Sequence, residues 1–424
     1  MHPRKLVLRS AVAGAIAILA FAISAGAATE KILHTFTGGN DGDEPVSTLI
    51  FDLKGNLYGT TPAGGAYGYG TVFELSPNSD GSWTESVLYS FGAYAGDGTG
   101  PLDYSGLIFD STGSLYGTTR EGGNPTCSFS NQGCGTVFKL TPNSGDWKET
   151  ILYNFMGTTD GIGPGGGLIF DQKGNLYGMA EEGGTPNCGG YGCGTIFKLS
   201  PGHEGTWNFS VLHALDESDG GFPFTGLSLD PSGLLWGTTN SGGPNGSMGV
   251  VFNLKRDGSN YQVVSSFDYQ GGDQPGLSTL AFGQAGHVFG NTSSGGSCNS
   301  GTVFMLSPSG RNNYKSKTIE CNSNTNAPLG SLLLSPSGHI YGTTRQGGSE
   351  HSQLCKTEGG CGTLYELVWH KGKGWKQTLL YKFKGGLDGY YPWAGVAMDK
   401  SGNLYGTTGY GGAYNAGTVF EVTP

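Results

Sequence analysis

The chain has 424 residues, including 80 glycines, with 12% aromatic and 13% charged residues and a net charge of −10 at pH 7. The glycines follow no three-residue period, which excludes a collagen helix, and the aromatic content argues against a disordered chain. The acidic charge balance, with no basic stripe in the sequence, argues against nucleic acid or an anionic membrane surface as a partner.

The N-terminal segment has the pattern of a secretory signal. Basic residues precede an apolar run at 11–23, and small residues close the segment at 25–28. We therefore predict a signal peptide over 1–28, with cleavage before Thr29. An uncleaved membrane anchor is the alternative, but the apolar run is short for one. The sequence shows no second apolar span and no C-terminal anchor, so we expect a soluble product that is secreted, periplasmic or at the cell surface.

From residue 30 onward the sequence is repetitive. The motif GNLYGTT at 55–61 is the first of seven related copies, 52 to 64 residues apart, the last at 402–408. A GTVF-like motif follows each copy, and a LIFD-like run precedes it. A fourth apolar run, such as SVLYSF at 86–91, comes after the GTVF motif. Each unit is therefore predicted to contain four strands, a to d.

Turn-forming residues separate these strands. The a–b connection, such as DLKGN, places a glycine where a tight hairpin needs a positive φ, and an Asp that can bond back to the turn. The strands are nearly continuously apolar, which fits sheets covered on both faces. Few stretches have helical spacing, so we predict an all-β seven-bladed β-propeller with four-stranded blades over 29–424.

The final unit ends one strand early. Its last motif is GTVFEVTP at 417–424, and no d strand follows. A segment with the d pattern, KILHTF at 31–36, instead precedes the first a strand. We predict that it pairs into the blade formed by 393–424 and closes the ring.

The repeated LYGTT…GG…GTVF motifs resemble the Gloeobacter/Verrucomicrobia (GloVer) tandem repeat of exported bacterial proteins, over essentially all of 30–424. The resemblance implies extracellular or cell-surface placement. Some members carry a C-terminal sorting anchor, which is not found in this sequence. No activity or catalytic residue can be transferred from the family.

The b–c and d–a loops emerge on one side of a propeller, where ligands usually bind. In this sequence the d–a loops carry recurring acidic residues, which are Asp41, Asp97, Asp160, Asp219, Asp273 and Asp388. These residues could form a cation site, with calcium as a weakly supported candidate, or could bind the hydroxyl groups of a sugar. Because the pattern recurs from unit to unit, a turn-forming role is the favoured interpretation. No EF-hand loop is present, and no cofactor or metal site is predicted.

Aromatic residues that depart from the repeat are better candidates for a ligand site on this face. Aromatic rings beside carboxylates commonly bind sugars. The candidates are Asp388, Tyr390, Tyr391, Trp393, Tyr410, Tyr414, Tyr67, Tyr69, Tyr104 and Phe224. The alternative interpretation, which we weigh more heavily, is that these rings plug the central channel or pad the contacts between blades.

Four histidines also depart from the repeat. His287 and His339 follow the a–b glycine in adjacent units, on the opposite face, where an acid–base or metal pair is conceivable but solvent-exposed turn residues are favoured. His34 and His213 replace Tyr in d strands. The sequence contains no nucleophile, metalloprotease or nucleotide-loop motif, and we predict no catalytic residue.

Eight cysteines, an even number, suit an exported chain with disulfides. Three pairs each fall inside one b–c loop at equivalent positions, Cys127/Cys134, Cys188/Cys193 and Cys355/Cys361. Bonds within these pairs would pin the long loops of the candidate binding face. Cys298 and Cys321 remain as a plausible fourth pair. Zinc is the alternative, but each pair supplies only two ligands.

The function predicted from these features is non-catalytic binding of an extracellular glycan or protein through the loop-rich face, by a monomer. The first alternative is a propeller enzyme, such as a lyase, lactonase or glycoside-cleaving enzyme, using acidic loop residues on that face. The second alternative is a structural cell-surface protein.

Overall fold

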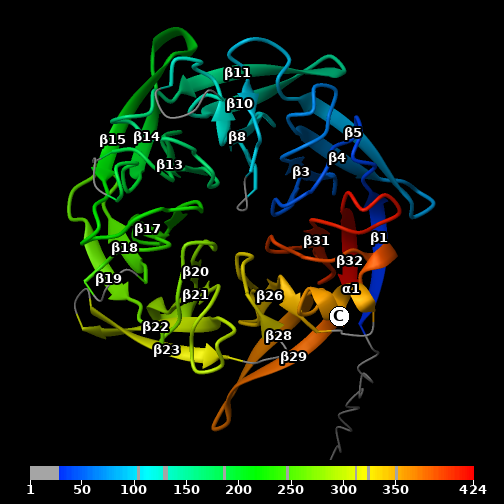
Figure 1. Cartoon of the computed structure of the whole chain (residues 1–424), viewed down its shortest axis with the longest axis vertical. Coiled ribbons are helices and arrows are strands. Elements are labelled where there is room, and N and C mark those ends of the chain that lie inside the picture. The colour runs from blue at the N-terminus through cyan, green and yellow to red at the C-terminus, as the bar shows by residue number, and fades with distance from the viewer. Residues whose placement is uncertain are drawn as a thin grey trace, which may run out of the picture.

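The computed structural model describes residues 28–102, 106–127, 132–184, 188–244, 248–310, 313–321, 325–348 and 352–424. Within these residues the strands form seven four-stranded antiparallel sheets, arranged as blades around a ring (Figure 1). The predicted all-β seven-bladed propeller is therefore confirmed. The predicted signal peptide, apart from Ala28, lies outside the described residues.

Each blade runs outward from a short a strand near the centre of the ring. Blades one to four are β2 (Ile50–Phe51), β3 (Leu57–Thr61), β4 (Thr71–Pro77), β5 (Trp83–Ser90); β7 (Ile108–Phe109), β8 (Leu115–Thr119), β10 (Thr136–Asn143), β11 (Asp146–Asn154); β12 (Ile169–Phe170), β13 (Leu176–Ala180), β14 (Thr195–Pro201), β15 (Trp207–Ala214); and β16 (Ser228–Leu229), β17 (Leu235–Thr238), β18 (Val250–Leu254), β19 (Gln262–Ser266). Blades five to seven are β20 (Ala281–Phe282), β21 (Val288–Thr292), β22 (Thr302–Gly310), β23 (Asn313–Glu320); β25 (Leu333–Leu334), β26 (Ile340–Thr344), β28 (Thr363–His370), β29 (Gly374–Lys382); and β30 (Ala397–Met398), β31 (Leu404–Thr408), β32 (Thr418–Thr423), β1 (Thr29–Thr35).

The ring closes through the two ends of the repeat region. Strand β1 pairs antiparallel with β32, with Thr29 opposite Thr423 and Thr35 opposite Thr418. The blue β1 accordingly lies beside the red β32 in Figure 1. The amide of Phe36 extends the pairing by donating to the carbonyl of Gly417 at 3.0 Å. The predicted closure is confirmed, and the strand begins two residues earlier than expected.

The glycine of the LYGTT motif has a packing role. In blade three Gly178 lies opposite Phe197 of the GTIF motif, across the β13–β14 pair. A Cβ at Gly178 would lie 2.5 Å from Cζ of Phe197 and 2.9 Å from Cδ2 of Leu168. The same arrangement occurs in every blade, with Tyr365 in place of Phe in blade six. The motif therefore contains glycine because the facing ring lies where a side chain would begin.

The core lies between neighbouring blades. The aromatic residue at the start of a d strand packs against the b-strand aromatic residue of the preceding blade. Trp207 lies 6.4 Å from Tyr116 between ring centroids, and Trp83 lies 6.2 Å from Tyr405 across the closure. The b strands are buried along their whole length, while the outer d strands begin with alternating half-buried and exposed residues. Each blade is thus stabilised mainly by its two neighbours.

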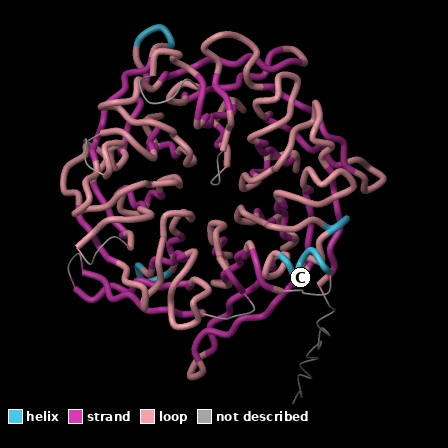
Figure 2. Tube along the Cα trace, in the orientation of Figure 1, coloured by secondary structure: helices cyan, strands magenta, loops and turns pink. Residues whose placement is uncertain are grey.

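The connections define two faces, whose loops are drawn in pink in Figure 2. We call the side with the a–b turns and c–d hairpins the turn face, and the side with the b–c and d–a loops the loop face. On the loop face every d–a loop pairs with the following b–c loop. In blades two and six these pairings form β6 (Gly98–Thr99) with β9 (Glu121–Gly122), and β24 (Thr325–Asn326) with β27 (Gln346–Gly347). The single helical turn α1 (Gln353–Thr357), which was not predicted, also lies on this face.

All four predicted disulfides are present. The three bonds within b–c loops have Cα atoms 5.7, 5.3 and 4.9 Å apart and are Cys127–Cys134, Cys188–Cys193 and Cys355–Cys361. The fourth bond joins Cys298 to Cys321, with Cα atoms 5.8 Å apart. Four disulfides indicate an oxidising compartment. In the part of the chain that the structure describes, no helix is long and apolar enough to span a membrane.

The loop disulfides are anchored in the core. Within these three b–c loops Cys134, Cys193 and Cys361 are each 0% exposed. These three directly precede the Gly-Thr that opens strand c, so their side chains point into the core that strand c completes. Cys134 belongs to the same buried cluster as Phe155, and Cys361 to that of Phe383. The bonds therefore tie each b–c loop to the core and present no sulfur from these three residues to a ligand.

Candidate functional site

The recurring acidic residues of the d–a loops hold turns. Asp97 accepts hydrogen bonds from the hydroxyl of Tyr89 at 2.9 Å and from two backbone amides of its own loop. Asp160 makes the equivalent bonds in the loop between blades two and three, and Asp388 makes them in the loop between blades six and seven. In the loop between blades three and four, His213 of β15 takes the place of the tyrosine and lies 2.7 Å from Asp219. This supports the turn-forming interpretation over a cation site.

A carboxyl group with a raised pKa lies beside one of these turns. Burial, with a smaller contribution from the charge of Asp97, raises the pKa of Glu149 from 4.5 to about 7. Hydrogen bonds oppose this rise, including one of 2.7 Å from the hydroxyl of Tyr94 to Oε2. The folded state therefore binds more protons than the unfolded state between these two pH values. It follows that the free energy of unfolding contributed by Glu149 falls as the pH rises from 4.5 through 7.

We expect Glu149→Gln to have little effect at pH 4 and to stabilise the protein at pH 8. Because one unit of pKa is worth about 1.4 kcal/mol, and partial exposure reduces the effect, the expected gain is about 1–2 kcal/mol. Thermal unfolding of both proteins across this pH range measures the difference. Glu204→Gln, at an exposed turn, is the control. A gain that is independent of pH would contradict the assignment.

The structure brings four of the predicted aromatic residues together on the loop face, between blades six and seven. The rings of Tyr390 and Tyr410 are stacked 5.4 Å apart. The guanidinium of Arg345 lies 4.6 Å from the ring of Tyr391 and 4.5 Å from that of Trp393. Tyr391 is only 4% exposed. This cluster therefore has the character of a packed joint between blades, as in the alternative interpretation.

The other predicted residues lie apart from a common pocket or are engaged in turns. Tyr67, Tyr69 and Tyr414 are 53%, 52% and 65% exposed, and Phe224 is half-buried in blade four. Asp388 is bonded to Tyr381 and to a backbone amide. Tyr104 lies outside the described residues.

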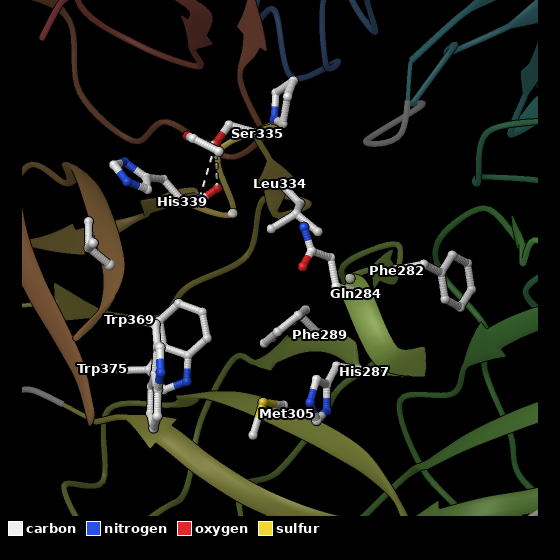
Figure 3. Close-up of a pocket in the computed structure, with 15 residues that line it drawn as sticks. Phe282, Gln284, His287, Phe289, Met305, Leu334, Ser335, His339, Trp369 and Trp375 are labelled. Carbon is white, nitrogen blue, oxygen red and sulfur yellow. Dashed lines mark hydrogen bonds between the residues drawn. The ribbon is translucent and has the colours of Figure 1, made fainter. Parts of the chain in front are cut away.

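A groove of about 880 Å³ opens on the turn face, between blades five and six. We call it the aromatic groove. Figure 3 shows Trp369 and Trp375 side by side on the blade six side, and Phe289, Met305 and His287 on the blade five side. The a–b turns of both blades, with Gln284 and His339, complete the rim. Two of the histidines predicted as turn residues thus line one groove.

The aromatic groove exists because blade five departs from the repeat at three places. In blades one to four and in blade seven an a–b turn Asp accepts hydrogen bonds from turn amides and from the b-strand tyrosine or tryptophan, as Asp171 does from Tyr177 at 3.0 Å. In blade six Ser335 accepts a hydrogen bond from the amide of His339 at 3.1 Å. In blade five Gly283 replaces this Asp, Phe289 replaces the tyrosine, and Met305 takes the place of a charged or amide residue. Three polar groups are lost together, which leaves an apolar surface where the other blades have a hydrogen-bonded turn.

Blade six contributes the opposite wall. Five units end strand c with Ser-Pro or Thr-Pro, whereas this unit has Val368-Trp369. Trp369 is 53% exposed, and its ring lies 5.7 Å from that of Trp375. Trp375 also packs 5.6 Å from Phe289 and so belongs to the ordinary contacts between blades. Trp369 is therefore the aromatic residue that the repeat does not need for packing.

Residues with polar groups also line the groove. Among the described residues, His287 Nδ1 and Trp375 Nε1 are buried without a hydrogen-bond partner. His339 Nδ1 lies 2.8 Å from Oε1 of Glu366, which also accepts a bond of 2.9 Å from the hydroxyl of Tyr341. His339 is thus held in place, with 36% of its side chain exposed, and is not a free surface residue. No group of three or more His, Cys, Asp or Glu suited to a metal ion occurs within the described ranges.

The sequence singled out His287 and His339 but not Trp369 or Met305. Both residues depart from the repeat, because Trp369 stands where five units have proline and Met305 stands where the other units have a charged or amide residue. Both lie in c strands whose motifs are otherwise regular, which makes the departures easy to miss.

The molecule is thus a seven-bladed β-propeller with an aromatic groove between two blades of its turn face. The Gloeobacter/Verrucomicrobia repeat family matches residues 17–191 and 185–357, and the chain belongs to this family. No curated protein matches the chain.

Solved propellers resemble the fold at low sequence identity. A proposed 6-phosphogluconolactonase from Bacteroides uniformis has a TM-score of 0.50 and 15% identity, covering 83% of this chain and 88% of its own. A Trichoderma reesei protein of carbohydrate-active enzyme family AA12 has a TM-score of 0.44 and 12% identity, covering 94% and 96%. At 15% identity the first likeness shows the fold alone.

Proposed function

We propose that this protein is an exported, non-catalytic propeller that binds a carbohydrate in the aromatic groove. The observation that carries the proposal is Trp369, a half-exposed indole that replaces the proline of five other units. Flat aromatic surfaces bind the apolar faces of sugar rings, and nearby polar groups bind the hydroxyls. The four disulfides and the predicted signal peptide support export.

The chemistry of the groove favours binding over turnover. Glycoside cleavage requires two carboxyl groups facing each other across the bond that breaks. Glu366 does not line the groove, and it is bonded to both His339 and Tyr341. The groove therefore offers rings and hydrogen-bonding groups without any carboxylate among its lining residues.

The test is binding of neutral oligosaccharides by isothermal titration calorimetry. We expect Trp369→Ala to weaken binding at least ~10-fold, because an exposed tryptophan that stacks on a ligand commonly contributes more than 1.4 kcal/mol. Tyr414→Ala is the matched control, since Tyr414 is similarly exposed but on the loop face. Trp393→Ala tests the cluster predicted from the sequence.

Two results would overturn this assignment. Loss of binding in Trp393→Ala with no change in Trp369→Ala would move the site to the loop face. Turnover of a sugar or lactone by the wild-type protein, abolished by Glu366→Gln, would replace binding with the enzymatic alternative.

A further inference from the structure

A second groove occupies the equivalent position between blades three and four. It has a volume of about 570 Å³ and, like the aromatic groove, is lined by two a–b turns and the end of a c strand. In blade four the Ser/Thr-Pro pair that ends strand c is replaced by Lys255-Arg256, at the position of Val368-Trp369 in blade six. The two units that lack the consensus proline therefore each contribute long side chains to a groove.

The chemistry of this second groove is cationic. Lys173, from an a–b turn, and Lys198, from β14, line it together with Lys255 and Arg256. We call it the cationic groove. Four positive side chains converge here in a protein whose net charge is −10. With the two carboxylates of Asp171 and Asp257, these four cations give the lining a formal charge of +2, opposite in sign to the net charge of the whole protein.

The two carboxylates in the cationic groove are already engaged. Asp171 accepts bonds from the backbone and side-chain amides of Asn175 and from Tyr177, and its side chain is only 3% exposed. Asp257 accepts bonds from the amide and hydroxyl of Ser259. Arg256 lies 3.7 Å from Asp171 and keeps 42% of its side chain exposed. Arg256 is thus in an ion pair with Asp171 but remains partly exposed, and among the described residues Lys173, Lys198 and Lys255 form no ion pair. These cations are available to an anion.

We propose that the cationic groove binds the carboxylate or sulfate groups of an acidic polysaccharide. The proposal rests on the proposed function, because the aromatic groove at the equivalent position on the same face is what makes a sugar chain the expected ligand. The guanidinium of Arg256 presents a planar pair of donors that matches a carboxylate or sulfate, and the lysines add point charges. Charge complementarity thus selects the acidic polysaccharides among the possible ligands.

The test compares three hexasaccharides, neutral cellohexaose, carboxylated hexagalacturonate and a sulfated galactan hexamer, with the full-length mature protein. We expect Lys255→Ser/Arg256→Ser to weaken binding of the better acidic hexamer at least ~10-fold, because hydrogen bonds to charged groups contribute more than neutral ones. Binding of cellohexaose stays unchanged. The acidic hexamer that binds more tightly identifies the anionic group.

Lys54→Ser/Lys400→Ser is the matched control, since it removes two exposed cations from a–b turns of the same face in blades one and seven. This variant is expected to bind like the wild type. Raising the salt concentration should weaken acidic binding only, because screening acts on the charged contacts.

The inference is overturned if the groove variant binds both acidic hexamers like the wild type, or if a single-stranded oligonucleotide of equal charge binds as tightly as they do. These outcomes are distinguishable from failure of the proposed function. That failure would appear as unchanged cellohexaose binding in Trp369→Ala while the cationic variant still loses acidic binding.

Discussion

Replacing Phe36 by Ala is expected to destabilise the protein by about 3–5 kcal/mol, the usual cost of removing a fully buried aromatic side chain. Phe36 is 0% exposed and packs 5.1 Å from the ring of Phe73 in blade one. It follows β1 directly, so its ring anchors the strand that completes blade seven. The midpoint and slope of chemical denaturation measure the change in the free energy of unfolding.

This prediction tests the closure of the ring. Leu53→Ala is the control, because Leu53 is fully exposed at an a–b turn of blade one. A loss of less than about 1 kcal/mol in Phe36→Ala would show that the contact contributes little to folding. Limited proteolysis provides a second measurement, because an opened ring would expose β1 and the edge of β32 to cleavage.

Gly178→Ala is expected to cost about 3 kcal/mol, at the upper end of the range for overpacking a buried site. The new methyl group would lie 2.5 Å from Cζ of Phe197, which is 0% exposed. Thermal or chemical denaturation measures the loss. Gly165→Ala is the matched control, because its backbone φ is ordinary and the nearest atom would lie 3.6 Å away.

A double-mutant cycle makes this prediction specific. In the Phe197→Leu background the smaller side chain leaves room for the methyl group, so Gly178→Ala should cost less than it does alone. Strict additivity of the two changes would show that the ring and the glycine are not coupled, and would contradict the packing explanation of the LYGTT motif.

The candidate site was only partly predictable. The acidic residues of the d–a loops were correctly interpreted as turn-forming, because an Asp bonded to nearby amides is a local arrangement. Four of the predicted aromatic residues, including Trp393, lie together, but their packing around Arg345 depends on a residue of another blade. The ligand-binding role proposed for them from the sequence remains a prediction.

The disulfides were likewise predictable only in part. Their pairing was predictable, because each loop pair recurs at one position of the repeat. The complete burial of Cys134, Cys193 and Cys361 was not, because it depends on the strands that pack over the start of strand c. Sequence spacing places a cysteine in a loop but does not show which side of the loop faces the core.

The number of blades, their strand order, the ring closure and the disulfide pairs could all be predicted from the amino-acid sequence. Each of these features follows from a short sequence pattern that recurs along the chain, and the repetition makes each pattern easier to recognise. Even the closing strand was visible, because KILHTF at 31–36 matches the other d strands.

The two grooves that could bind a ligand could not be predicted from the sequence and are visible only in the tertiary structure. The aromatic groove is made by 282–305 of blade five and 334–375 of blade six, and neither segment forms it alone. The cationic groove likewise joins Lys173 to Arg256 across two blades. A linear pattern shows that a residue departs from its repeat, but not which departures face each other. That depends on how neighbouring blades pack.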